Sequence, residues 1–433
     1  MTQEKVNNEK HIVPPVSRRH FLVGAAATLG TPYILTSAAL GQAGSGKAPA
    51  NSRIVMGQIG IGNQGSGLLG GFMGQRQVQM IAVSDVKPDI LDNAYKRIGS
   101  PPGGAHKDFR ELLNRADIDA VVMAVPDHWH ALMTVMAAQA GKDIYCEKPM
   151  SLTVHEGRAM VNEVRHHGRV FQTGSMQRSM GTFQNAVNAV RNGLIGKVKT
   201  ITIGLPNNGQ TSLEWGLTRP PESEPPAGFD YDMWLGPAPW RPYNPERVSG
   251  NYGGGWRYYR DYSGGMMTDW GAHHFDIAQW ALNMDNSGPV EVFPAGSGGF
   301  ETLTYKYADG TTMSLGPRGF PNGVLFKGEN GEIFCDRGKV TPENLRGYKP
   351  GPQEVDVNRR RGHFEDWIEC IQTRSKPICD VEIGHRSATV CHLGNIAQWT
   401  NRAFKWDPQA EQIVGDEAAS RWLSRPYRAP WQL

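Results

Sequence analysis

The chain has 433 residues, enough for two or three domains, and 39% of them are hydrophobic. Its 52 glycines and 29 prolines make up about a fifth of the residues, which is typical of a loop-rich folded protein and too few for a collagen-like or disordered one. A net charge of only +3 argues against a nucleic-acid partner. The five cysteines are odd in number and include no C-x-x-C pair, so neither a disulfide scaffold nor a zinc ribbon is expected. No metal site is expected at His273 and His274, because the spacing offers no third ligand.

The first 43 residues have the composition of an export signal. Ser17-Arg18-Arg19-His20-Phe21-Leu22 precedes a weakly apolar stretch, and small residues follow at 37–43. This order resembles a twin-arginine signal peptide, although a membrane anchor with a chance arginine pair would look similar. Because that pathway carries folded proteins, the interpretation predicts three things: the twin-arginine export machinery as a partner, a periplasmic or other extracytoplasmic location, and a cofactor bound tightly before export.

A dinucleotide site is predicted directly after the leader. Residues 53–59 form an apolar run typical of a buried strand, G-I-G-N-Q-G follows at 60–65, and a helix can begin thereafter. In the context of strand, G-x-G-x-x-G and helix, the three glycines allow a tight turn, close approach of a pyrophosphate and packing of helix on strand. The predicted cofactor contacts of this motif are Gly60, Gly62, Asn63, Gln64 and Gly65.

The next apolar run, 78–84, ends at Asp85, 20 residues beyond the last glycine of the motif. An acid at this place binds the ribose hydroxyls and repels a 2′-phosphate, so NAD is favoured over NADP. Lys87 lies close enough to leave NADP possible.

Two further strand-like runs end in polar clusters. Residues 119–125 lead into Pro126-Asp127-His128-Trp129-His130, with a helix expected from about 131 to 140, and residues 142–146 lead into Glu147-Lys148-Pro149. Ligands of parallel sheets lie beyond the carboxyl ends of the strands, so both clusters are expected at the nicotinamide end of the cofactor. The predicted contacts are Pro126, His130, Glu147 and Lys148, while loop capping explains His128 and His130 equally well.

A catalytic group is predicted around Asp269 and His273, which are four residues apart and would share a helix face with Asp276. A histidine beside a carboxylate suits a general base with a pKa near neutrality. Lys148 would hold the same reacting oxygen and stabilise its developing negative charge. We therefore expect Lys148, Asp269 and His273 to be catalytic; a helix-stabilising contact is the alternative for the Asp269–His273 pair.

Taken together, these motifs resemble the glucose-fructose oxidoreductase, inositol dehydrogenase and MocA-like family. The resemblance rests on G-I-G-N-Q-G, on V-P-D-H-W-H, on C-E-K-P-M at 146–150 and on S-G-G-M-M-T-D-W-G-A-H-H-F-D at 263–276. It implies an α/β fold, with an N-terminal Rossmann domain on a parallel sheet and a C-terminal α+β domain on a large, mainly antiparallel open sheet. It also implies a homo-oligomer (dimer or tetramer) and hydride transfer between NAD or NADP and a sugar or polyol.

The expected domains are the Rossmann domain at 51–172, the second domain at 173–406 and a tail at 407–433 that docks on the surface. The segment 206–262 is rich in Gly, Pro, Trp and Tyr, which suits either a sugar site or a loop-built core. Helices are expected at 183–192, 363–373 and 387–403. The suggested substrate contacts are Gln177, Arg178, Arg257 and Tyr259, together with Asp269 and His273.

Two other functions remain open at this stage. A glycosidase could use NAD for redox-assisted elimination, in which oxidation of one sugar carbon acidifies its neighbour and releases the leaving group. A non-catalytic sugar-binding protein could also keep the fold, although the presence of both Lys148 and His273 argues against it.

Overall fold

The computed structural model describes residues 48–209, 211–212, 221–250, 255–359 and 361–433. The expected signal peptide over residues 1–43 lies outside this part of the chain. Within the described part, every helix is too short or too polar to cross a membrane. Residues 52–433 pack as one unit built on two sheets.

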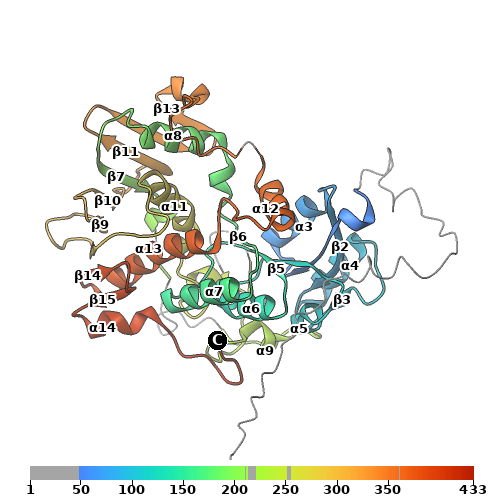
Figure 1. Cartoon of the computed structure of the whole chain (residues 1–433). Helices are drawn as coiled ribbons and strands as arrows, with labels where there is room; N and C mark the ends of the chain where they lie inside the picture. The colour runs from blue at the N-terminus through green and yellow to red at the C-terminus, as the bar shows by residue number, and fades with distance from the viewer. Residues whose placement is uncertain (1–47, 210, 213–220, 251–254, 360) are drawn as a thin grey trace, which may run out of the picture. The chain divides into compact units, whose positions relative to one another are not determined.

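The first sheet has six parallel strands in the order β3-β2-β1-β4-β5-β6 (Figure 1). This order confirms the predicted Rossmann arrangement, in which the strand sequence reverses between β1 and β4. The strands are β1 (Ile54–Ile59), β2 (Val78–Ser84), β3 (Ala105–His106), β4 (Ala120–Met123), β5 (Asp143–Cys146) and β6 (Phe171–Thr173).

Helices cover both faces of this sheet, because alternate residues of each buried strand point to opposite sides. Val121 and Met123 of β4 pack with α5, α6 and α7, whereas Ala120 and Val122 pack with α3 and α4. These helices are α3 (Asn63–Met73), α4 (Pro88–Arg97), α5 (Phe109–Leu113), α6 (Asp127–Gln139) and α7 (Val154–His166).

The second sheet has nine strands in the order β13-β12-β11-β7-β10-β9-β8-β14-β15. Only the β7–β10 pair is parallel, which confirms the mainly antiparallel sheet. The strands are β7 (Val198–Gly204), β8 (Glu291–Phe293), β9 (Thr304–Lys306), β10 (Thr312–Leu315), β11 (Gly323–Gly328), β12 (Glu332–Asp336), β13 (Lys339–Thr341), β14 (Phe404–Asp407) and β15 (Gln412–Val414).

One face of this sheet is covered by α8, α11 and α13. Ile201 and Ile203 of β7 point into that core, while Thr200 and Thr202 alternate with them on the more open face. The remaining helices are α8 (Gly181–Arg191), α9 (Tyr231–Leu235), α10 (Met266–Asp269), α11 (Gly271–Ala281), α12 (His363–Thr373), α13 (Val381–Thr400) and α14 (Glu417–Ser420). Short 3-10 turns occur at Ala50–Ser52, Met176–Ser179, Pro206–Gly209, Gly255–Tyr258, Glu343–Gly347 and Arg421–Leu423.

Two predicted helix starts were wrong, and both true starts have a local cause. Helix α6 begins at Asp127 rather than near 131, because Pro126 provides the extended residue before the first turn. Helix α13 begins at Val381 rather than 387, because the Asp380 carboxylate accepts a hydrogen bond from the Glu382 amide and caps the first turn.

Helix α12 lies between strands β13 and β14 of the second sheet along the chain but packs on the first sheet. Figure 1 shows it beside α3, and the Phe364 and Trp367 rings both contact Phe72 of α3, with centroids 4.5 and 5.5 Å away. Trp367 is fully buried there with Ile368. The two sheets are therefore built from interlocked segments of the chain.

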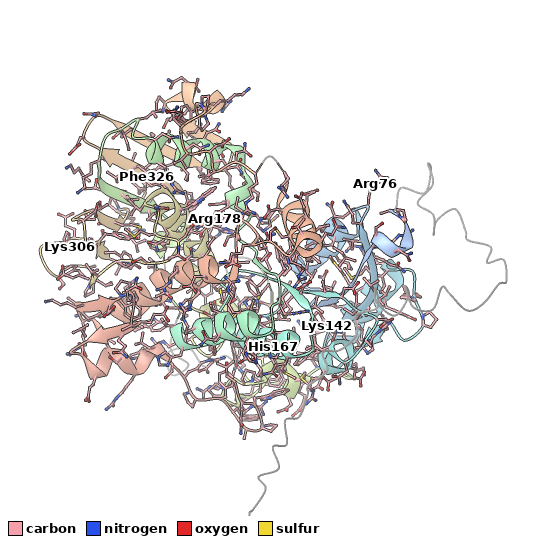
Figure 2. All side chains as sticks on the ribbon, in the orientation of Figure 1. Arg76, Lys142, His167, Arg178, Lys306 and Phe326 are labelled. Carbon is pink, nitrogen blue, oxygen red and sulfur yellow. The ribbon has the colours of Figure 1, made fainter. Side chains whose placement is uncertain are left out.

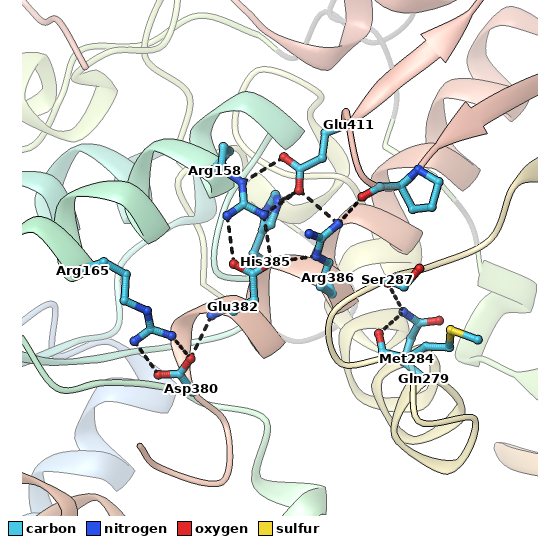
Figure 3. A network of polar contacts seen from close by, with 11 residues as sticks. Arg158, Arg165, Gln279, Met284, Ser287, Asp380, Glu382, His385, Arg386 and Glu411 are labelled. Carbon is cyan, nitrogen blue, oxygen red and sulfur yellow. Dashed lines mark hydrogen bonds and ion pairs between the residues drawn. The ribbon is translucent and has the colours of Figure 1, made fainter. Parts of the chain in front are cut away.

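An ion-pair cluster also joins the two parts of the chain (Figure 3). Arg158 of α7 lies between Glu382 of α13 and Glu411 of the β14–β15 turn, at 2.8 and 2.6 Å. His385 and Arg386 of α13 complete it, with nitrogen atoms 2.7 and 3.2 Å from Glu411. Arg158, Glu382, Arg386 and Glu411 each have more than one oppositely charged partner, so the cost of removing these four charges from water is offset.

The last residues of the chain combine two roles. Residues 412–414, expected in a docking tail, instead form the edge strand β15. The chain then returns to the first domain, where Arg425 and Tyr427 bind the Glu156 carboxylate at 2.7 and 2.8 Å and Trp431 packs on Trp129.

We expect Trp367→Ala to lower the free energy of unfolding by about 3–5 kcal/mol, because it leaves a large cavity between α12 and the first sheet. Trp240→Ala is the matched control, since the Trp240 side chain is 63% exposed and its loss changes stability by less than about 0.5 kcal/mol. Urea unfolding monitored by circular dichroism measures both. Equal effects of the two variants would contradict the packing of α12 described above.

Candidate active site

A cavity of about 590 Å³ lies at the carboxyl ends of the first sheet's strands. Its other walls come from the aromatic segment before α10, from α10 and α11 themselves, and from the β12–β13 turn. Of the predicted residues, the cavity wall includes Gly60, Gly62, Asn63, Gln64, Asp85, Pro126, Glu147, Lys148, Arg257, Asp269 and His273.

The three glycines of the motif have different surroundings, and these fit a bound dinucleotide. Gly60 has a φ of +80°, and a Cβ there would lie 2.5 Å from the Ala124 carbonyl oxygen. A Cβ on Gly65 would lie 2.2 Å from the Gly60 carbonyl oxygen, so this glycine permits the close turn. A Cβ on Gly62 would meet no atom within 4 Å and would instead fill part of the cavity. The open side of Gly62, at the start of α3, is where a pyrophosphate can approach backbone amides.

Two side chains hold this loop in place. Gln58 is buried at the end of β1 and donates to the carbonyl oxygens of Gly65 and Gly60, at 2.6 and 3.2 Å. Asp85 accepts from the amides of Ile61 and Lys87, at 2.9 and 3.0 Å. Burial raises the pKa of Asp85, and these two amides partly offset the effect. Gln58 was missed in the sequence because it lies inside an apolar run.

Glu147 connects the loop to Lys148. Its carboxylate accepts from the Gln64 amide nitrogen at 3.0 Å and from the Lys148 backbone amide at 3.1 Å. Burial raises the pKa of Glu147, while Lys148 and Gln64 act against this shift.

Lys148 and Asp269 meet across the cavity. The Lys148 ammonium donates to an Asp269 carboxylate oxygen, and also to the Asp269 carbonyl oxygen at 3.1 Å. Arg257 approaches the other carboxylate oxygen at 3.5 Å. Burial alone would raise the pKa of Asp269, but Lys148 and Arg257 outweigh it and hold the pKa below its ordinary value. Asp269 therefore stays ionised.

The predicted Asp269–His273 pair is not present, because the two residues do not share one helix. Asp269 ends α10, α11 begins at Gly271, and the chain turns at Trp270 between them. His273 lines the cavity, with its Nδ1 buried and without a hydrogen-bond partner among the described residues. Burial, together with Lys148 and Arg337, lowers the pKa of His273 well below its ordinary value. The imidazole is thus neutral at pH 7, in contrast to the expected pKa near neutrality.

Asp127 is a further acidic group in the cavity wall, and no role was predicted for it from the sequence. It is the first residue of α6 and is 3% exposed, and its Oδ2 has no partner among the described residues. Burial raises its pKa to about 7, with Ser263 and Arg257 acting against the shift. Its position after strand β4 and Pro126 was the sequence feature that could have indicated a place in the cavity wall.

His130 lies behind the cavity wall rather than in it. Its Nδ1 lies 2.7 Å from the Pro149 carbonyl oxygen, and burial lowers its pKa to about 4, so the neutral ring donates this bond. His130 thereby fixes the backbone that carries Lys148. His128 is buried against Trp234, with its Nε2 3.0 Å from the Trp234 carbonyl oxygen.

The structure does not bring Gln177, Arg178 or Tyr259 to the cavity. Arg178 is buried in the interior (Figure 2), where its guanidinium donates to Asp276 at 2.8 Å and to Asp285 at 2.7 Å. Gln177 is fully buried next to it, and the Tyr259 ring stacks with Arg247. Their role as substrate contacts stays a prediction, and Arg178 is already paired with two carboxylates from distant parts of the chain.

The aromatic segment contributes both to a core and to the cavity wall. Its rings form a small core of their own that includes Tyr231, Tyr243 and Tyr262. Trp234 and Trp256 belong to that core and also line the cavity. Residues 213–220 and 251–254 of this segment lie outside the described part of the chain.

A Rossmann sheet whose glycine loop opens on a cavity closed by a second α/β domain defines a two-domain class of NAD-binding oxidoreductase. The chain belongs to the oxidoreductase family of glucose-fructose oxidoreductase, inositol dehydrogenase and MocA. Residues 54–175 match the family's NAD-binding Rossmann fold, and residues 180–433 match its C-terminal alpha/beta domain. This confirms the predicted family and fold.

Individual relatives are distant. The chain is 30% identical over 205 residues to a glycosyl hydrolase family 109 protein of Shewanella pealeana, spanning 44% of that protein, and 26% identical to myo-inositol 2-dehydrogenase of Thermotoga maritima, spanning 68% of it. The WlbA dehydrogenase of Bordetella pertussis, solved with NADH and UDP-GlcNAcA, has a TM-score of 0.58 at 18% identity. The match covers 82% of this chain and 99% of that one, and it shows a shared fold.

We expect Gly62→Ala and Gly65→Ala to separate cofactor binding from stability. The Gly62 methyl group meets no protein atom, so stability falls by no more than about 1 kcal/mol, whereas the affinity for NAD falls at least roughly tenfold because the methyl occupies the pyrophosphate side of the loop. Gly65→Ala disturbs the turn itself, so it lowers both the stability of the protein and its affinity for NAD. Calorimetric titration with NAD and urea unfolding measure the two properties. Unchanged NAD affinity of Gly62→Ala would exclude this loop as the pyrophosphate site.

We expect Asp127→Asn to change how stability depends on pH. The pKa of Asp127 is raised to about 7 in the folded protein, above its value in the unfolded chain. The folded state therefore favours the protonated carboxyl group, and the free energy of unfolding falls as pH rises from about 4 through 7. The asparagine variant lacks this loss, and its stability relative to the parent increases by about 2–4 kcal/mol over that range. Urea unfolding at pH 4 and pH 8 measures it, with the exposed Asp92→Asn as control. A pH-independent difference would contradict the assignment.

Proposed function

We propose that the protein is an NAD-dependent oxidoreductase acting on a hydroxyl or carbonyl carbon of a sugar or polyol. The observation that carries the proposal is that Lys148 and His273 line the same cavity as the glycine loop. A proton-accepting group, an N–H donor and a dinucleotide site therefore border one space. Alcohol oxidation needs all three.

Lys148 and His273 would divide the handling of the substrate oxygen. The ammonium of Lys148 has three N–H donors and directs two of them to Asp269, so one remains for the substrate hydroxyl. The neutral imidazole of His273 accepts the hydroxyl proton as the carbonyl forms. Asp269 holds the Lys148 side chain in position, so that its N–H groups can stabilise the negative charge on the oxygen during the reaction.

NAD would be held by the amides beside Gly62, by Asn63 and Gln64 and by Asp85, and when bound it supplies the hydride acceptor. Asp85 supports NAD over NADP because its carboxylate repels a 2′-phosphate. The Lys87 ammonium is directed to the Val248 carbonyl oxygen, 3.3 Å away, which also supports this preference. Tight binding of NAD, export and oligomerisation remain predictions.

A second candidate is NAD-dependent glycoside cleavage. It is favoured by the relatives named as glycosyl hydrolase family 109 proteins and as the alpha-N-acetylgalactosaminidase of Shewanella oneidensis. The same Lys148 and His273 would serve it, because the route begins with oxidation of a sugar hydroxyl. The two functions differ in whether bound NAD is changed after turnover.

We expect His273→Gln to lower the rate of NAD reduction by about 10²–10⁴-fold with sugars or myo-inositol, because it removes the proton acceptor. His274→Gln is the matched control: His274 is next in sequence, lies outside the cavity wall and bonds the Gly204 carbonyl oxygen at 2.6 Å. Absorbance at the nicotinamide band measures the rate, and calorimetry verifies that both variants still bind NAD.

Three outcomes distinguish the candidates. An unchanged rate in His273→Gln would remove this residue from the reaction. Release of nitrophenol from a nitrophenyl N-acetylgalactosaminide, without net NAD reduction, would establish the glycosidase instead. Sugar binding with neither reaction would identify a non-catalytic binding protein.

A further inference from the structure

Arg337 is a cation at the cavity that the proposed reaction does not use. It lies in the turn between β12 and β13 and lines the cavity together with His273 and Trp270. Its guanidinium carbon lies 4.6 Å from the centroid of the Trp270 ring. Among the described residues, no carboxylate lies within 4.0 Å of its nitrogen atoms. The two other cations beside it, Lys148 and Arg257, share the Asp269 carboxylate.

The position of the Arg337 guanidinium over the Trp270 ring leaves its N–H groups able to bind a ligand. A guanidinium that lies over an aromatic face keeps the N–H groups at its edge available, and these match the two oxygens of a carboxylate or phosphate. Trp270 directly follows Asp269 and lies three residues before His273, so the cation is held beside the reacting groups. Its field reaches them, since Arg337 contributes to the lowered pKa of both Asp269 and His273.

We propose that the substrate is an anionic sugar, whose carboxylate or phosphate binds Arg337 while the reacting hydroxyl lies between Lys148 and His273. The proposal rests on the proposed function and names the substrate class of that same site. It predicts that sugar acids or sugar phosphates are preferred to their neutral counterparts. Arg337 determines this specificity and takes no part in proton transfer.

The test compares Arg337→Ala and Arg337→Lys with the control Lys339→Ala. Lys339 carries the same charge on the same hairpin, is exposed and lies outside the cavity wall. The probes are the neutral sugars glucose and galactose, their acids glucuronate and galacturonate, and glucose 6-phosphate. The readouts are kcat/KM for NAD reduction and, independently of turnover, calorimetric binding of each probe to the NAD-loaded protein.

We expect Arg337→Ala to weaken binding of the preferred anion, and to lower its kcat/KM through KM, by about 10- to 150-fold, as for loss of one charge-assisted hydrogen-bonded pair. Neutral sugars and NAD change less than about threefold, Arg337→Lys recovers part of the loss, and Lys339→Ala resembles the parent. Preference for uronates or for the sugar phosphate identifies which anion is the ligand.

Two results would overturn the assignment: neutral sugars bound as tightly as every anion by the parent, or equal losses for neutral and anionic probes in Arg337→Ala. Failure of the proposed function is distinguishable from both. In that case the anion binds and the binding depends on Arg337, while no probe reduces NAD.

Discussion

The contact between Lys148 and Asp269 is the interaction on which the site depends. Lys148 follows β5 of the first sheet, and Asp269 ends α10, 121 residues further along the chain. Both charged groups are largely withdrawn from water, at 14% and 5% side-chain exposure, so neither would be stable there without the other. Their pairing fixes a positive group beside His273, and that positive field, added to burial, keeps the imidazole neutral.

This contact can be maintained because the two sheets are tied together elsewhere. Helix α12 buries Trp367 on the first sheet, the Arg158 cluster joins α7 to α13, and Arg425 returns from the end of the chain to Glu156. In each of these contacts, a residue from the second half of the chain binds or packs against the first sheet or one of its helices. These ties hold together the segments that form the cavity walls, and fixed positions of charged groups are the condition for electrostatic stabilisation of a developing charge.

Local sequence signals predicted the geometry of the glycine loop that lines the cavity. The turn at Gly60, the open side of Gly62 and the contact at Gly65 follow from backbone sterics over six residues, so the order strand, glycine loop and helix was sufficient. On the other side of the cavity, the presence of Lys148, Asp269 and His273 was predicted, but which of them pair was not. The predicted Asp269–His273 pair assumed a continuous helix, but the helix is interrupted at Trp270. Asp269 therefore pairs with Lys148, and His273 has no carboxylate partner among the described residues.

The sequence by itself determined the Rossmann domain, the second domain with its mainly antiparallel sheet, and the identity of the glycines, Asp85, Lys148 and His273 as cavity residues. The Rossmann domain and the cavity residues depend on short-range patterns: apolar periodicity, glycine spacing and the ends of strands. The second domain and its mainly antiparallel sheet were implied by the family resemblance. Only the tertiary structure decided which charges pair. It assigned Arg178 to Asp276 and Asp285, buried Asp127 in the wall and placed Arg337 on Trp270. Coulomb and desolvation energies depend on distance and burial in three dimensions, and residues far apart in sequence meet only after folding.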